Sequence, residues 1–111
     1  MKLPGGEQAW IDSRKLREYI LSPSHPVGRF KAVLFAKLGY TQANWQELEA
    51  VLRRSAIQDE AQARESTPYG QKYAVRSILE GPSGTRAEVI SIWIVRSGET
   101  APRLITVMPV R

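Results

Sequence analysis

The sequence predicts an α+β fold in which N-terminal helices pack on one face of a C-terminal antiparallel sheet of three to four strands. Two observations carry this prediction. Apolar residues recur at helical spacing through residues 13–56, and the period changes to that of strands in residues 69–111. Helices that precede a run of strands, instead of alternating with them, are typical of α+β proteins. The 111 residues are expected to form one domain, 1–111.

The chain is expected to open with a lead-in of residues 1–12, in which the segment 9–11 adds an edge strand. Ser13 is a suitable N-cap for a first helix of about two turns, and Pro23 would end it.

Ser24 would cap the second helix, with Pro26 in its first turn, where a missing N–H costs nothing. Gly39 would follow its last residue. Thr41 or Asn44 would then cap the third helix.

Residues 57–68 are polar and aperiodic, which predicts a surface linker. Strands are expected at 71–79, 86–96 and 103–110, with a GPSG turn between the first two. Pro109 indicates that the last strand lies at an edge or ends there.

The second strand alternates between two faces. Ile90, Ile92 and Ile94 share one face, which is expected to pack against the helices. The other face carries Ser91 and Trp93 and is expected to be the more open one.

A binding patch for RNA would then lie on this open face. Aromatic side chains beside arginines suit stacked bases and phosphates. The alternative is a sheet in which small polar residues merely fill awkward positions. The patch would hold Tyr73, Ser91, Trp93 and Thr106, with Arg96 and Arg103 at its loop end. The expected substrate-binding residues are Tyr73, Ser91, Trp93 and Arg96.

The second helix carries a lysine among apolar residues. On a wheel with about 100° per residue, Lys31 falls inside the arc that holds Val27, Phe30, Leu34 and Leu38. That arc is expected to face the core, so Lys31 should point toward the sheet edge. Its ammonium would either reach water past an apolar stem or line a cleft.

His25, the only histidine, lies where the second helix is expected to begin. The positive end of the helix dipole disfavours an imidazolium there, and a neutral imidazole is what a general base requires. The alternative is a surface histidine that only starts a helix. Gly28 in the first turn would allow close backbone approach, to a strand or to a phosphate at the helix N-terminus.

The formal net charge of +5 and the pI of about 9.9 favour a polyanionic partner such as RNA, DNA or an acidic protein. The alternative is a merely basic surface. No apolar run approaches the roughly 20 residues of a membrane span, and the N-terminus lacks the apolar stretch of a signal peptide. No membrane association is therefore expected.

The residue types present exclude several classes of catalytic and metal site. The absence of cysteine excludes disulfides, thiolate metal sites and cysteine nucleophiles. One histidine and two aspartates do not suffice for a two-metal cluster, and no P-loop or GxGxxG is present, so neither metal nor cofactor is expected. An enzyme would work with His, Lys, Arg and hydroxyls. RNA phosphodiester cleavage fits, because the 2′-hydroxyl supplies the nucleophile.

The strings HPVGRFKAVLFAKLGY, YGQKYAV and SIWIVRSGETAPRLITV resemble a bacterial family named only as a domain of unknown function. That family occurs as stand-alone proteins and as C-terminal modules of polymorphic toxins. Its pattern is HPxGxxKAxxF, YGxxY, a small hydroxyl residue before Trp, and PRLxT. The matching residues are His25, Pro26, Gly28, Lys31, Ala32, Phe35, Tyr69, Gly70, Tyr73, Ser91, Trp93, Pro102, Arg103, Leu104 and Thr106.

The helix-then-meander order also resembles the barnase, EndoU, colicin and RelE-like ribonuclease fold, whose members cleave RNA without metal. The resemblance implies His25 as base or acid, Lys31 and Arg103 for phosphate charge, and Thr106 and Ser91 as hydroxyl donors.

The function that this resemblance implies is a toxin-type, metal-independent ribonuclease. It would act in the cytoplasm or be delivered to a target-cell cytoplasm. A cognate antitoxin or immunity protein would cover its open sheet face. The alternatives are a non-catalytic module that binds RNA or a protein, and a structural domain without a ligand.

Overall fold

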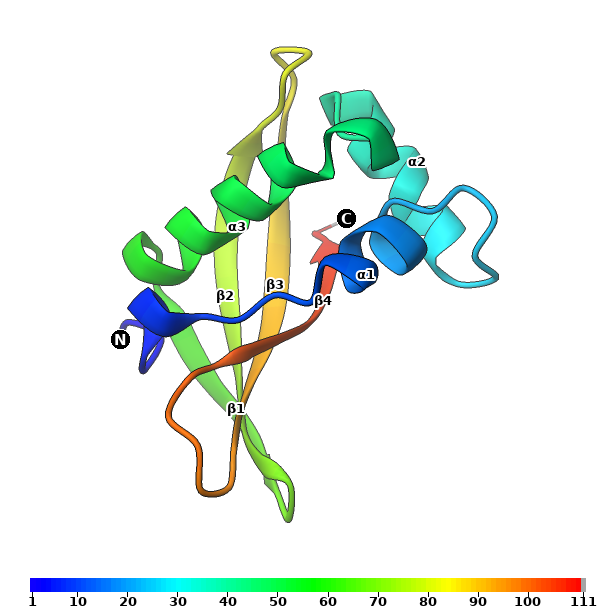
Figure 1. Cartoon of the computed structure of the whole chain (residues 1–111). Helices are drawn as coiled ribbons and strands as arrows, with labels where there is room; N and C mark the ends of the chain where they lie inside the picture. Colours follow the sequence, from blue (N-terminus) through cyan, green and yellow to red (C-terminus); the bar gives the residue numbers. More distant parts are fainter. Residues whose placement is uncertain (111) are drawn as a thin grey trace.

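A computed structural model describes residues 1–110, in which helices come first and a sheet follows (Figure 1). Two short 3₁₀ turns, Gly6–Gln8 and Gln42–Asn44, precede the first and last helical segments. The elements are α1 (Ser13–Lys15), which continues as a π-type turn (Leu16–Ile20), α2 (Gly28–Leu38), α3 (Trp45–Gln58), β1 (Ala61–Thr67), β2 (Gly70–Glu80), β3 (Arg86–Arg96) and β4 (Arg103–Pro109).

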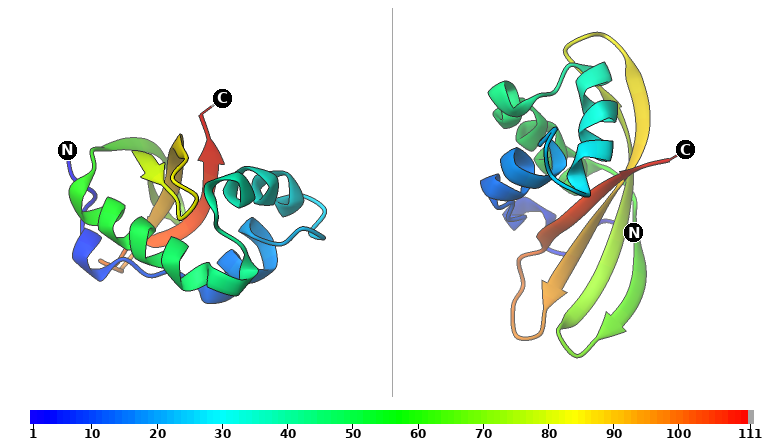
Figure 2. Two further views of the ribbon diagram at one scale, coloured as in Figure 1. Left: turned by 90° about the horizontal axis from the view of Figure 1, so that it is seen from above. Right: turned by 90° about the vertical axis from the view of Figure 1, so that its right-hand side faces the viewer.

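The four strands form one antiparallel sheet in the order β1-β2-β3-β4. All helices lie on one side of this sheet and leave the other side uncovered (Figure 2). The predicted α+β fold is therefore confirmed, with four strands. No helix in residues 1–110 has the length and apolar character needed to cross a membrane.

The linker predicted for residues 57–68 is wrong, because α3 runs to Gln58 and the next residues form β1. Ala61 pairs with Val75 and Thr67 pairs with Gly70. The five residues 62–66 are exposed, so the strand shows no apolar alternation. Its backbone ladder with β2 holds it at the sheet edge, and composition alone did not reveal it.

The faces of β3 are the reverse of the prediction. Val89, Ser91 and Trp93 are at most 1% exposed and face the helices, while the isoleucines are half-buried on the uncovered side. The strand register explains this outcome, because Lys72 and Arg76 on β2 stand opposite isoleucines of β3. Burying that face would bury two charged side chains, which is costly.

Helix α2 is rotated relative to its predicted orientation. Gly28, Ala32, Phe35 and Leu38 are its buried residues, whereas Val27 and Phe30 are more than half exposed. Gly28 packs directly against the backbone carbonyl of residue 19, and this contact sets the rotation of the helix. Gly28, Ala32 and Phe35, spaced i, i+4 and i+7, therefore face inward.

The helix ends show which side chains act as caps. Asp12, not Ser13, caps α1 by accepting the N–H of Arg14 at 3.0 Å. Gly39 ends α2 with a φ of 101°, as predicted.

Thr41 and Asn44, both predicted as caps, form a reciprocal capping box before α3. The edge strand expected at 9–11 reduces to a single bridge between Trp10 and Arg103.

Candidate functional site

Three of the four predicted catalytic residues meet around Tyr19, which the sequence did not single out for function. The His25 ring lies edge-on at 4.9 Å from the Tyr19 ring, and the Lys31 ammonium lies 5.8 Å from the same ring. The Tyr19 hydroxyl is 3.3 Å from Thr106 Oγ1. All four side chains are half-buried. We call Tyr19, His25, Lys31 and Thr106 the Tyr19 cluster.

His25 lies two residues before Val27, the N-cap residue of α2, and its side chain caps the start of the helix. Its Nδ1 accepts hydrogen bonds from the backbone N–H groups of Val27 at 3.0 Å and Gly28 at 2.9 Å. These are donors that a helix start leaves unsatisfied. Because Nδ1 is an acceptor here, the neutral ring carries its proton on Nε2. The imidazole therefore presents its Nε2–H as a hydrogen-bond donor, while the lone pair of Nδ1 is already occupied by the two backbone N–H groups.

Ser24, the predicted cap of α2, does not have this role. Instead, Ser22 Oγ accepts the N–H groups of Ser24 at 3.3 Å and of His25 at 3.2 Å. The entry to α2 is thus held by two consecutive side-chain caps, Ser22 and then His25. The sequence signal was the repeated serine before HP, and it did not tell which residue would cap.

Lys31 points toward the sheet edge, as predicted, and its ammonium has a partner there. The Nζ atom donates to the carbonyl oxygen of Val107 at 3.1 Å, and Lys15 Nζ donates to that of Ile105 at 3.0 Å. Both carbonyls belong to β4, one of the two edge strands of the sheet. The two lysines cover an edge that would otherwise offer free acceptors to another strand.

Gly28 is close to backbone and not to a phosphate. A Cβ atom at this position would lie 1.7 Å from the carbonyl oxygen of Tyr19. Contact between the start of α2 and the end of the α1 segment therefore requires glycine, and this contact brings His25 next to Tyr19.

Arg103, the fourth predicted catalytic residue, contacts none of the Tyr19 cluster through its guanidinium. Its guanidinium stacks over Trp10 at 5.0 Å and donates to both carboxylate oxygens of Glu99 at 3.1 Å. Its charge is thus paired within the β3–β4 connection.

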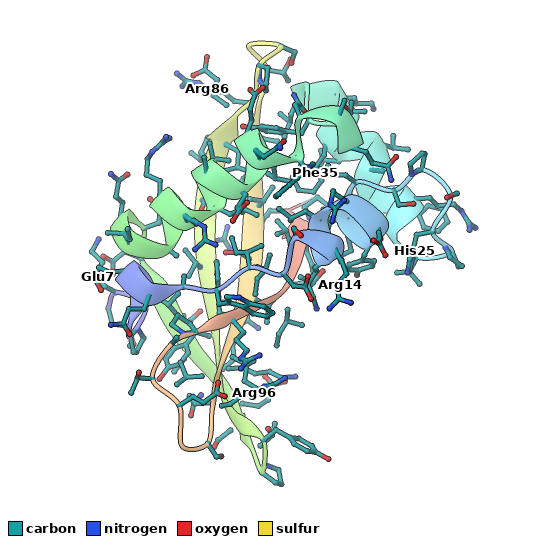
Figure 3. The ribbon with its side chains drawn as sticks, viewed as in Figure 1. Glu7, Arg14, His25, Phe35, Arg86 and Arg96 are labelled. Atoms are coloured by element: carbon teal, nitrogen blue, oxygen red, sulfur yellow. The ribbon has the colours of Figure 1, made fainter. Side chains whose placement is uncertain are left out.

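The predicted binding patch on the sheet does not form. Ser91 and Trp93 are buried in the core, where the indole N–H donates to Ser91 Oγ, and Tyr73 packs against the same core. Thr106 pairs with Ile92, so the irregular register around residue 105 places it on the other face. Arg96 is exposed at the end of β3 and lies apart from His25, below it and nearer the centre in the view of Figure 3.

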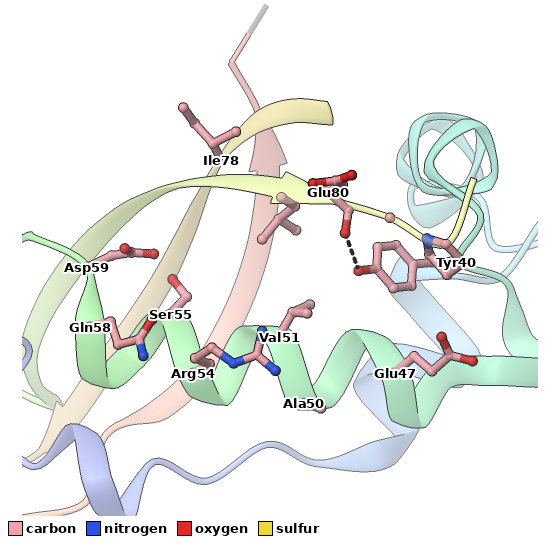
Figure 4. A pocket seen from close by; sticks show the side chains of 13 residues that line it. Tyr40, Glu47, Ala50, Val51, Arg54, Ser55, Gln58, Asp59, Ile78 and Glu80 are labelled. Atoms are coloured by element: carbon pink, nitrogen blue, oxygen red, sulfur yellow. Dashed lines mark hydrogen bonds between the residues drawn. The ribbon is translucent and has the colours of Figure 1, made fainter. Parts of the chain in front are cut away.

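A hollow with a volume of about 730 Å³ lies away from the Tyr19 cluster, between α3 and the end of β2 (Figure 4). It contains none of the Tyr19 cluster. The Tyr40 hydroxyl donates to the carbonyl of Glu80 at 3.4 Å along its wall, and burial raises the pKa of this hydroxyl. Within residues 1–110, no three His, Asp or Glu side chains are grouped to hold a metal ion.

Comparison with solved structures finds the same fold in one chain of a structure titled "Contact-dependent growth inhibition toxin - immunity protein complex from Klebsiella pneumoniae 342". The two chains are 21% identical with a TM-score of 0.68, and the match covers 89% of this chain and 97% of that one. Comparison with curated proteins returns no significant match. A family model described as "Domain of unknown function (DUF6883)" matches residues 2–111. The chain therefore belongs to the DUF6883 family.

Proposed function

We propose that this protein is a toxin-type ribonuclease that cleaves RNA without a metal ion. The observation that carries the proposal is the convergence of His25 and Lys31, from the start of α2, and of Thr106, from β4, on Tyr19. The likeness of fold to a chain of a toxin–immunity complex supports it. The basic balance of the sequence, +5 at neutral pH, supports RNA as the substrate.

The chemistry proposed is attack of the RNA 2′-hydroxyl on the adjacent phosphorus with loss of the 5′-oxygen. One P–O bond forms and one breaks. A solvent water would take the proton of the 2′-hydroxyl and another would give a proton to the leaving 5′-oxygen, so the protons balance. No co-reactant is needed. Negative charge develops on the phosphoryl oxygens, so fixed donors around them lower the barrier.

The Tyr19 cluster would supply those donors. His25 offers Nε2–H from a neutral ring held at a helix N-terminus, an arrangement suited to polarising an oxygen without a net charge on the ring. The hydroxyls of Tyr19 and Thr106 and the Lys31 ammonium would complete the set. Arg96 and Arg103 would contact phosphates further along the RNA.

A non-catalytic binding module is the second candidate, and one observation favours it. His25 Nδ1 and Lys31 Nζ already bind backbone atoms of this chain, so both residues have a structural role without any substrate. Under this alternative the same surface binds RNA or a protein, and no bond is cleaved.

A pair of His25 variants separates the two candidates. His25→Asn keeps a side-chain oxygen that can accept the N–H groups at the start of α2, since Asn is among the best caps, but it removes the imidazole. His25→Ala removes both. The assay is incubation of total RNA and of tRNA with each protein in EDTA, beside a thermal melt of each variant.

A catalytic His25 predicts cleavage by the wild type, with none by His25→Asn although its melting temperature stays near that of the wild type. Cleavage by His25→Asn at the wild-type rate would mean that His25 serves only as a helix cap. Intact RNA after incubation with the wild-type protein would contradict the ribonuclease proposal and favour the non-catalytic binding module.

A further inference from the structure

The outward side of α2 carries large apolar side chains that the fold leaves uncovered. Val27, Phe30 and Val33 are 56%, 68% and 59% exposed. They follow each other at intervals of three residues, so they share one side of the helix. We call these three residues the α2 patch. In the view from above, α2 lies beside β4, at the opposite side of the molecule from β1 (Figure 2).

Two shallow hollows flank the α2 patch, each with a volume of about 330 Å³. Both are lined by Pro23, Ala32 and Ala36, so they run into one another along the helix. Phe30 and Val33 line one of them. Small side chains between larger apolar ones form a surface into which a partner's side chain fits.

The charged side chains of the segment that carries the α2 patch are of one sign. The sequence has no Asp or Glu between Glu18 and Glu47, while Arg29, Lys31 and Lys37 lie in that interval. Lys31 is bound to the edge of β4. Arg29 and Lys37 form no salt bridge with any residue of 1–110, and the Arg29 guanidinium lies over the Phe30 ring at 4.6 Å.

We infer that the α2 patch docks an acidic protein partner, through an apolar anchor surrounded by Asp and Glu side chains. The rim charges argue against a second copy of this chain, because Arg29 and Lys37 would then face like charges. Phe30 beside Arg29 could stack a base, but Val27, Val33 and the alanine-lined hollows offer RNA neither a stacking face nor a cation, so the patch as a whole fits a protein better.

The identity of this partner as an immunity protein rests on the proposed function. His25 lies two residues before Val27, so a protein seated on the α2 patch would border the Tyr19 cluster and keep RNA from it. The inference thus places the partner on α2 and not on the uncovered side of the sheet.

The probe is a pair of labelled helical peptides of about 15 residues with one leucine stripe in common. One peptide has Glu flanking the stripe and the other has Lys. Fluorescence anisotropy with the full chain measures each affinity at low and high salt, without RNA. We expect the Glu peptide to bind about tenfold more tightly than the Lys peptide, and the difference to shrink with salt.

Matched variants locate the binding surface. Phe30→Ser should weaken binding of the Glu peptide about tenfold, because an apolar anchor loses its contact. Ile78→Ser on the uncovered sheet face changes a side chain of similar exposure, 71% against 68%, and should leave binding unchanged. Arg29→Glu with Lys37→Glu should reverse the peptide preference, whereas Arg54→Glu on α3 should not.

Three results would overturn the inference. These are equal affinity for the two peptides, a loss of binding with Ile78→Ser but not with Phe30→Ser, and a wild-type dimer in gel filtration that Phe30→Ser converts to monomer. Failure of the proposed function is a separate result, since His25→Asn should bind the Glu peptide like the wild type whether or not the protein cleaves RNA.

Discussion

The indole Nε1–H of Trp93 donates to the Oγ atom of Ser91 over 2.8 Å, and both side chains are buried at the centre of the core. Ser91 in turn donates to the carbonyl of Val75 on β2. A serine and a tryptophan two residues apart on one strand face are therefore partners in packing, and neither is accessible to a ligand.

Ser91→Ala should lower the free energy of unfolding by about 1–3 kcal/mol, because it leaves a buried indole donor without an acceptor. Adding Trp93→Phe removes that donor, so the double variant should lose less than the sum of the two single changes. Urea unfolding of the four proteins measures both. Loss of RNA binding in Ser91→Ala at unchanged stability would contradict the buried role.

Tyr19→Phe keeps the ring that contacts His25 and Lys31 and removes only the hydroxyl beside Thr106. We expect a stability loss of about 1 kcal/mol or less, the usual net worth of one hydrogen bond. If the Tyr19 cluster cleaves RNA, the rate should fall by more than this stability change can explain. Thr106→Val removes the other hydroxyl of the same pair at similar volume and should lower the rate as well; a wild-type rate in both variants would contradict a catalytic role for this pair.

Lys31→Met should destabilise the fold by about 1–3 kcal/mol, because the carbonyl of Val107 loses a charged donor at the edge of β4. Lys31→Arg should restore most of the loss. The exposed edge should also promote self-association, which light scattering detects. A Lys31→Met protein as stable as the wild type would mean that the ammonium serves a ligand and not the sheet edge.

Gly28→Ala should destabilise the protein, although alanine favours helix by roughly 1 kcal/mol over glycine. The added Cβ would lie 1.7 Å from the carbonyl oxygen of Tyr19, so the start of α2 must move away from the α1 segment. Overpacking of this kind costs about 1–3 kcal/mol. Thermal melts test the sign, and a gain in stability would show that the two segments are free to separate.

The stability contributed by Asp12 should depend on pH. Hydrogen bonds from the Arg14 side chain and backbone hold the pKa of Asp12 below its usual value of 3.8. A depressed carboxyl pKa stabilises the folded state fully above 3.8, and this contribution is lost as the pH falls through the lower folded value.

Melting temperatures of the wild type and Asp12→Asn across this range provide the measurement. The advantage of the wild type should be constant near neutral pH and shrink below pH 3.8. An advantage that does not change with pH would mean that Asp12 acts only as a neutral cap.

Local chemistry made much of the fold predictable. The strand 86–96 and the cap residues Gly39, Thr41 and Asn44 were predicted where the structure has them. Each depends on β-branched residues in a row, a positive φ or a short side chain near its own backbone, and these causes act within a few residues of the chain.

The candidate site was predictable only in part. The helix position, together with the family resemblance, pointed to His25 and Lys31, and the resemblance pointed to Thr106. Tyr19 could not be assigned, because its place between them arises from contact of the α1 segment with α2 and β4. Arg103 was expected with them, but it pairs with Glu99 instead.

Apart from β1, the sequence by itself determined where this chain forms helices and strands and that the helices cover one face of an antiparallel sheet. The tertiary structure alone decided which face that is. β3 is apolar on both sides, so its own alternation gives no preference, and only the register with Lys72 and Arg76 on β2 makes one side too costly to bury. The same holds for α2, whose buried side is set by the contact of Gly28 with residue 19. Which side of a strand or helix is buried depends on residues that are distant in sequence. Whether the strand or helix forms depends on residues that are close in sequence.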